Sequence, residues 1–210
     1  MSKRGQITIF IIIAIVIIAI LVILFWPRIK TAVAPSAPQA FVQDCAENAV
    51  EEILETISLQ GGSLNPENYI LYKGNKVQYI CYTNNYYKKC VMQQPFLKQN
   101  IEEQLNNYVE PRVQECLENL EQQMEKKGKS ITIGKAKVKT SIVKNFIILN
   151  IDAPFVISGD AASSFENFKV DIRSSLYELI MISSSIANWE ARYGDSDPQT
   201  YMPVSYTHLT

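Results

Sequence analysis

Four cysteines are the residues of this chain whose chemistry is easiest to predict. They are Cys45, Cys81, Cys90 and Cys116. An even number of cysteines in a soluble segment favours two disulfides in an oxidising compartment, with buried free thiols as the alternative. The chain has no CxxC spacing, so the cysteines do not indicate a thiolate zinc site.

Tyrosines and lysines form a second cluster. The tyrosines considered as a binding surface are Tyr72, Tyr79, Tyr82, Tyr86 and Tyr87. Aromatic faces next to lysines could bind a glycan or a polyanion. The same tyrosines could instead form cross-strand pairs that stabilise a sheet. The strand-like sequence around them favours the pairing interpretation.

Groups that enzymes use in catalysis are sparse. The only histidine is His208, near the C-terminus, which excludes the usual nucleophile–imidazole systems from the rest of the chain. Helical spacing of the acidic residues Glu47, Glu51, Glu52 and Glu55 indicates a solvated helix face. A carboxylate pair could be drawn from Asp152, Asp160 and Asp171, which lie in or near predicted strands. We therefore predict no catalytic residues, no cofactor and no metal site, and a protein that is not an enzyme.

Residues 7–26 form an uncharged apolar segment in which Thr8 is the only polar side chain. At about 1.5 Å rise per residue, such a helix spans the hydrocarbon core of a bilayer. Trp26 suits the water boundary, and Pro27 cannot continue the helix. The sequence thus predicts one transmembrane anchor, and Lys3 and Arg4 favour a cytoplasmic N-terminus.

The remainder predicts one α+β domain at residues 41–203, reached through a linker at residues 27–40. Hydrophobic periodicity and turn residues predict these elements: a helix at 41–59, a hairpin at 69–73 and 76–82, a helix at 96–127, strands at 131–143, 146–157 and 165–172, and a helix at 173–193. This order predicts a small antiparallel sheet with helices packed on one face.

Several details of these elements can be tested. Gly74 and Asn75 are expected to form the hairpin turn. Pro111 should kink the long helix or start a second one. The continuous apolar run of 146–157 suggests a strand covered on both faces, with Pro154 at an edge or a bulge.

The predicted elements also suggest how the cysteines pair. Cys81 and Cys90 flank a short loop in which Asn84 and Asn85 can reverse the chain. Cys45 and Cys116 lie on the apolar stripes of two helices that should share a core. We therefore predict the disulfides Cys45–Cys116 and Cys81–Cys90.

The N-terminus resembles a class III, type IV pilin-like leader. The residues that carry the resemblance are Lys3-Arg4-Gly5-Gln6-Ile7-Thr8-Ile9-Phe10. It implies cleavage between Gly5 and Gln6, with the apolar helix retained. The family usually has glutamate five residues after the cleavage site, where this chain has Phe10, and this departure argues against packing in a filament.

The chain also resembles uncharacterised membrane-anchored proteins of archaea. The similar segments are the leader, Leu59-Gln60-Gly61-Gly62, Tyr108-Val109 and Cys116-Leu117. Residues 204–210 resemble a translated sequencing adapter, which implies an artefact that displaces native residues beyond Pro203.

The formal net charge of −1 argues against a nucleic-acid-binding protein. The predicted protein is a single-pass membrane-anchored module outside the cytoplasm, with a binding or structural role. Its expected partners are the lipid bilayer and a protein or another cell-surface component. The alternative is a minor pilin-like subunit of a surface filament.

Overall fold

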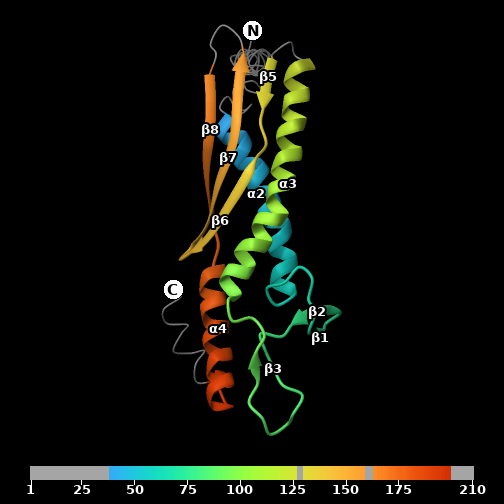
Figure 1. The fold of residues 1–210 in the computed structure, drawn as a ribbon, viewed down its shortest axis with the longest axis vertical. Coiled ribbons are helices and arrows are strands. Elements are labelled where there is room, and N and C mark those ends of the chain that lie inside the picture. The colour runs from blue at the N-terminus through green and yellow to red at the C-terminus, as the bar shows by residue number, and fades with distance from the viewer. Residues whose placement is uncertain (1–37, 127–129, 159–162, 200–210) are drawn as a thin grey trace, which may run out of the picture. The chain divides into compact units, whose positions relative to one another are not determined.

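The computed structural model describes residues 38–126, 130–158 and 163–199. Its elements are α2 (Pro38–Leu59), β1 (Tyr69–Tyr72), β2 (Asn75–Gln78), β3 (Cys81–Tyr82), β4 (Val91–Met92), α3 (Leu97–Lys126), β5 (Ser130–Ile133), β6 (Lys137–Val143), β7 (Phe146–Ser158), β8 (Ser163–Arg173) and α4 (Leu176–Tyr193) (Figure 1). The predicted leader, the predicted span 7–26 and residues 204–210 lie outside the described residues. Within those residues, no helix has the length and apolar character needed to cross a membrane.

The predicted α+β class is confirmed. The main sheet is antiparallel and has β7 at its centre. β5 and β6 pair in succession with one side of β7, and β8 pairs with the other side. Two short ladders, β1–β2 and β3–β4, lie apart from this sheet.

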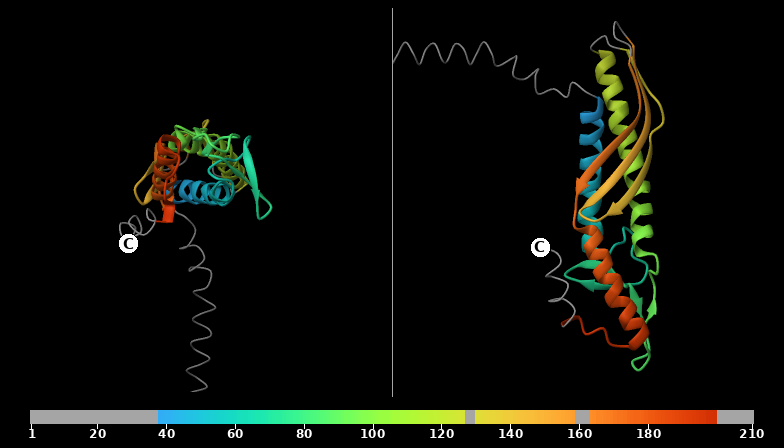
Figure 2. Two further views of the ribbon diagram at one scale, coloured as in Figure 1. Left: turned by 90° about the horizontal axis from the view of Figure 1, so that it is seen from below. Right: turned by 90° about the vertical axis from the view of Figure 1, so that its left-hand side faces the viewer.

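α2 runs along one face of the main sheet, and one side of the helix is buried (Figures 1 and 2). The buried side chains of this side are Val42, Cys45, Ala46, Ala49, Val50, Ile53 and Ile57. The helix begins at Pro38, so the predicted linker, which was extended to residue 40, ends too late. Proline suits the first turn of a helix because the N–H that it lacks would have no helical acceptor there.

α3 runs without a break from Leu97 to Lys126, with Pro111 inside it. Of the two alternatives for Pro111, the start of a second helix is therefore wrong. Tertiary hydrogen bonds flank the proline, since Glu110 and Gln114 both accept backbone N–H groups of the neighbouring strand. These contacts hold the chain in helical geometry on both sides of the missing N–H.

The outer edge of β5 and β6 is closed by side chains of α3 rather than by another strand. Four acceptors at four-residue spacing each bind an alternate backbone N–H of the edge. The pairs are Ile142 N to Glu102 Oε1 at 2.7 Å, Thr140 N to Asn106 Oδ1 at 2.6 Å, Val138 N to Glu110 Oε2 at 3.2 Å and Ala136 N to Gln114 Oε1 at 2.7 Å. Ile133 N continues the series with a longer bond of 3.4 Å to Glu121 Oε1.

The four-residue spacing of the acceptors on α3 matches the two-residue spacing of the outward N–H groups on the strand edge, for a simple geometric reason. Four residues of an α-helix rise about 6 Å, and two residues of a strand advance roughly 6.6 Å. Each helical step of four therefore reaches the next outward N–H of the strand. An unpaired strand edge is a template for association with other chains, and α3 satisfies that edge internally.

The strands differ from expectation in two places. The predicted strand 131–143 is interrupted after Ile133, where Gly134 N donates to Pro154 O of β7 at 2.7 Å. Opposite this interruption, β7 and β8 shift register between Asp152 and Phe155, so the bulge expected at Pro154 is present.

The expectation that β7 is covered on both faces is wrong. Its buried residues alternate with exposed Asn150 and Asp152, and β6 presents exposed Lys137 and Lys139 on the same open face. The sequence hides this alternation because Ile148, an apolar residue, also lies on the open face. Its side chain is half-buried there.

A disulfide and the contacts of Glu52 with Arg112 and Tyr108 join α2 to α3. The Cys45–Cys116 disulfide is present as predicted, with its Cα atoms 6.1 Å apart. Arg112 Nε donates a hydrogen bond to Glu52 Oε2 at 3.2 Å, and its guanidinium lies 3.4 Å from the centroid of the Tyr108 ring.

These contacts shift the pKa values of the groups involved. The hydrogen bond from Tyr108, and to a smaller extent the one from Arg112, lowers the pKa of Glu52. Burial, followed by the bond to Glu52, raises the pKa of Tyr108.

We predict that Asn106→Leu destabilises the protein by about 1–3 kcal/mol, because Thr140 N–H loses its acceptor next to a buried residue. The matched control is Asn107→Leu, at the exposed neighbouring position. Urea unfolding measures both free energies, and hydrogen exchange at the Thr140 amide should quicken only in the first variant. Equal losses in the two variants would contradict the role of the acceptor.

We also predict an acid-dependent contribution from Glu52. A carboxyl group whose pKa is lowered by folding stabilises the protein above its unfolded pKa and loses this contribution as pH falls through the folded value. The stability advantage of the wild type over Glu52→Gln should therefore be present at neutral pH and disappear in acid. Denaturant unfolding across this range tests it. The same comparison of Glu52 with Glu52→Gln is then made in a protein that also carries Tyr108→Phe and Arg112→Met. If the difference in the free energy of unfolding still depends on pH to the same extent, another contact is responsible.

Candidate functional site

The predicted tyrosine surface lies in residues 69–90, which we call the tyrosine-rich end. It contains the β1–β2 hairpin and the disulfide loop, defined as Cys81–Cys90. The hairpin turn is formed by Lys73 and Gly74, with φ of 48° and 84°, rather than by the predicted Gly74 and Asn75. Positive φ at both central residues is the requirement of a type I′ turn, and this places the turn one residue earlier.

The favoured interpretation of the tyrosines, cross-strand pairing, is wrong for this hairpin. Its register places Tyr69 opposite Gln78 and Tyr72 opposite Asn75. The second predicted strand also ends early, at Gln78, and β3 pairs with β4 instead. Lysines lie near the hairpin rings: Lys76 Nζ is 4.8 Å from the Tyr69 centroid and Lys73 Nζ is 5.4 Å from that of Tyr72.

Backbone contacts attach the tyrosine-rich end to the helices. Gln78 N donates to Gln60 O at 3.1 Å, next to Gly61, which follows α2 with φ of 70°. A Cβ at Gly61 would lie 2.9 Å from Gln78 O, so a side chain is excluded there. Gln104 of α3 accepts from Leu64 N and donates to Gly62 O, which ties this connection to α3.

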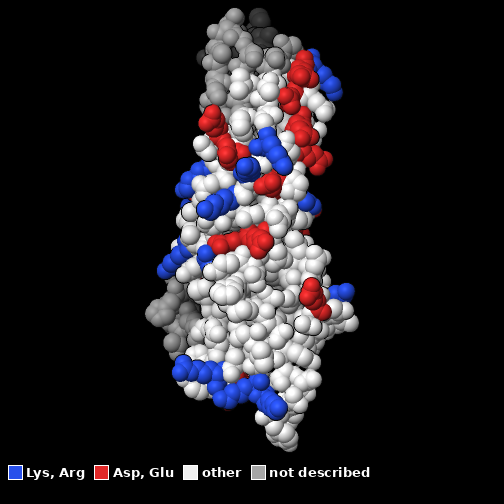
Figure 3. All heavy atoms as spheres, viewed as in Figure 1, with Lys and Arg blue, Asp and Glu red and all other residues white. Residues whose placement is uncertain are grey.

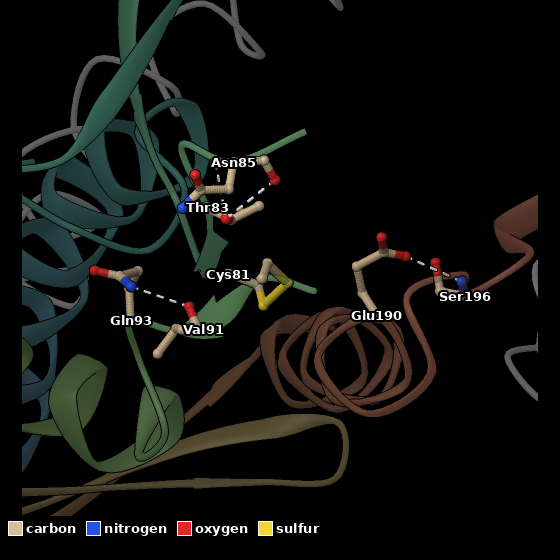
Figure 4. Close-up of a disulfide and its surroundings, with 8 residues drawn as sticks. Cys81, Thr83, Asn85, Val91, Gln93, Glu190 and Ser196 are labelled. Carbon is tan, nitrogen blue, oxygen red and sulfur yellow. Dashed lines mark hydrogen bonds between the residues drawn. A yellow bond between two sulfur atoms is a disulfide. The ribbon is translucent and has the colours of Figure 1, made fainter. Parts of the chain in front are cut away.

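The disulfide loop is closed by the predicted Cys81–Cys90 bridge, whose Cα atoms are 5.5 Å apart. Inside it, Asn85 N donates to Thr83 Oγ1 at 3.1 Å (Figure 4). Lys88 N closes a turn by donating to Asn85 O at 3.1 Å, and Lys89 Nζ donates to Arg192 O of α4. The loop therefore has an internal hydrogen-bonded structure and a contact with the end of α4.

The five predicted tyrosines differ in exposure and in their ring contacts. Tyr86 and Tyr87, at the tip of the loop, have exposed fractions of 93% and 95%, and Tyr72 is 61% exposed on the hairpin. The tip rings meet edge to face, with centroids 5.0 Å apart and planes at 89°. Tyr79 and Tyr82 contact each other at 4.8 Å, and Tyr79 is half-buried.

A groove of about 650 Å³ separates this end from α4. Tyr79 and Tyr82 line one side, and Ile186 and Glu190 of α4 line the other. Glu190 accepts from Ser196 N at 3.0 Å, beside the disulfide (Figure 4). The side-chain carbonyl of Gln78 is buried at this groove without a hydrogen-bond partner in the described part of the chain.

The other predicted sites are not assembled into catalytic groups. Asp152 lies opposite Asn167 and Asp171 lies opposite Ile148, so the register places these carboxylates on separate rows of the sheet. Asp160 lies outside the described residues. Across the described ranges, no group of three or more His, Cys, Asp or Glu could hold a metal ion.

The lysines of this end were noted in the sequence, but its lack of acidic residues was missed. The chain has no Asp or Glu between Glu67 and Glu102, whereas it has lysines at 73, 76, 88, 89 and 98. The overall charge conceals this local basic excess, which a scan along the chain would have found. The contribution of α4 to the groove could not be found in this way, because no local pattern links residues that are so far apart in the chain.

Comparison of the chain with protein families, curated proteins and solved structures found no match.

We predict unequal effects of the two disulfides. Loop-closure entropy for sequence separations of 71 and 9 makes the Cys45–Cys116 bridge about 2 kcal/mol more stabilising than the Cys81–Cys90 bridge. Cys45→Ser with Cys116→Ser should therefore lower the free energy of unfolding more than Cys81→Ser with Cys90→Ser. Denaturant unfolding compares them. The second pair should instead accelerate amide exchange in residues 82–89, and unchanged exchange there would show that the bridge does not order the loop.

Proposed function

We propose that the chain is a non-enzymatic binding module, tethered outside the cytoplasm by its N-terminal apolar segment, that recognises a partner through the disulfide loop. The observation that carries the proposal is that Tyr86 and Tyr87 have exposed fractions of 93% and 95% and lie on a loop closed by its own disulfide. Large aromatic side chains are the residues most enriched at the energetic centres of protein interfaces.

The energetics of the loop support a binding role. Each tyrosine ring can remove roughly 150 Å² from water on binding, at about 25 cal/mol per Å². The bridge and the Thr83–Asn85 and Lys88–Asn85 hydrogen bonds order the loop before any partner arrives. Ordering a loop in advance lowers the entropy that binding must overcome.

The location of the loop supports a tether at the N-terminus. Within the unit formed by residues 42–210, the N-terminal part of α2 lies in the half that contains the main sheet, and the disulfide loop lies at the opposite end (Figures 1 and 2). A tether leading into α2 would leave the loop on the side away from its point of attachment. The two disulfides support an oxidising compartment, and the uncharged segment 7–26 has the length of a membrane span.

We predict that a photo-crosslinking residue placed at Tyr86 or Tyr87 in the full chain gives a discrete adduct in intact cells. The control is the same residue at Asn150, an exposed position on the open face of the sheet. Lysines 137 and 139, exposed on the open face of the sheet, should also react with a membrane-impermeant amine reagent, and the protein should stay in membranes after carbonate extraction. Adducts no more frequent than at Asn150 would refute the binding role. Protection of both lysines from the reagent in intact cells would refute the location outside the cytoplasm. Recovery mainly in sheared filaments would support a pilin-like subunit instead.

A further inference from the structure

We infer that the partner recognised by the disulfide loop is a protein that presents an acidic surface. This inference rests on the proposed function and names the chemistry of the partner. Three observations lead to it: the charge around the loop, the composition of the loop, and the arrangement of the rings at its tip.

The charge of the tyrosine-rich end is of one sign. No acidic residue occurs between Glu67 and Glu102, so the hairpin and the loop contribute lysines alone. Arg192 of α4 adds another cation next to Lys89, whose ammonium group bonds its backbone carbonyl. In Figure 3, Lys and Arg side chains form a band at the lower end of the visible face, whereas its upper part carries acidic and basic side chains side by side. A local excess of positive charge attracts an oppositely charged partner and opposes one of like charge.

The loop has the composition of a protein-recognition loop. Between its cysteines it contains Tyr, Thr, Asn, Asn, Tyr, Tyr, Lys and Lys. In antibody binding loops, tyrosine supplies rigid contact area at a low entropic cost, and small polar residues supply adaptable hydrogen bonds. Thr83 and Asn85 already bond each other, which leaves the tip tyrosines at the end of an ordered loop.

The geometry of the rings argues against a glycan. A sugar ring stacks its flat face of C–H groups on an aromatic face, and neighbouring aromatic rings can hold successive sugars of a chain only when their planes are similar. The planes of Tyr86 and Tyr87 stand at 89° to each other. Such a pair offers one ring face and one ring edge, which suits the irregular side-chain surface of a protein.

The test uses three anionic probes against the full chain in nanodiscs of uncharged phosphatidylcholine. The probes are a random copolymer of glutamate and tyrosine as the acidic polypeptide, polygalacturonate as the acidic polysaccharide, and vesicles containing phosphatidylglycerol. We expect the copolymer to bind most tightly, with an affinity that falls as salt is raised. Tyr86→Ser with Tyr87→Ser, and separately Lys88→Ser with Lys89→Ser, should each weaken it by about tenfold or more.

Two controls make the test specific to the loop. Lys137→Ser with Lys139→Ser makes the same charge change on the open face of the sheet and should leave copolymer binding within about twofold. Tyr86→Phe with Tyr87→Phe retains both rings and should restore most of the affinity that the serine variants lose. All variants are first compared by denaturant unfolding, because a loss of affinity counts only in a folded protein.

Several outcomes would overturn the inference. These are tighter binding of polygalacturonate or of the vesicles, equal losses in the sheet-lysine control, or no binding of any probe. The proposed function is tested separately by crosslinking at Tyr86 and Tyr87 in cells. Discrete adducts there, together with a preference for polygalacturonate, would refute the acidic protein partner and leave the binding module intact.

Discussion

The match between the rise of an α-helix and the repeat of a strand edge is the constraint on which this fold depends. Side-chain oxygens of α3 at Glu102, Asn106, Glu110 and Gln114 accept alternate backbone N–H groups of the edge strand. Buried backbone donors need acceptors, so these bonds set the register of the helix along the sheet. A slide of α3 by one residue would remove all of these acceptors from their donors.

This register in turn positions the tyrosine-rich end. The sheet holds α3, and the start of α3 holds the segment after α2 through Gln104, which bonds both Leu64 N and Gly62 O. The Cys45–Cys116 bridge and the contacts of Glu52 with Arg112 attach α2 to the same helix. The disulfide loop therefore projects from an assembly with several independent attachments. Exposed tyrosines on such a support lose little conformational entropy when a partner covers them.

Part of this architecture could be predicted from local pattern. The α+β class, both disulfides and the bulge at Pro154 follow from periodicity, cysteine placement and the backbone preferences of proline. The ladder also has a sequence signature that was missed. From Leu97 to Leu117, a buried apolar residue recurs every fourth position, and from Ile101 to Val113 an acceptor follows each one directly. A period longer than the 3.6 residues of a helical turn makes the stripe wind around α3, as a helix beside a twisted strand requires.

The sequence by itself determined which segments are helix or strand and which cysteines could meet, because these depend on the spacing of apolar residues and on short connections. Only the tertiary structure decided that Pro111 stays inside a helix, that the hairpin turns at Lys73 and Gly74, and that β7 has an open face. At Pro111, hydrogen bonds from distant backbone groups to Glu110 and Gln114 outweigh the local preference of proline to end a helix. The exposed position of Tyr86 and Tyr87 was decided in the same way. Their residue type suits a core or a surface equally, and the attachment of the loop to β4 and α4 leaves them in water.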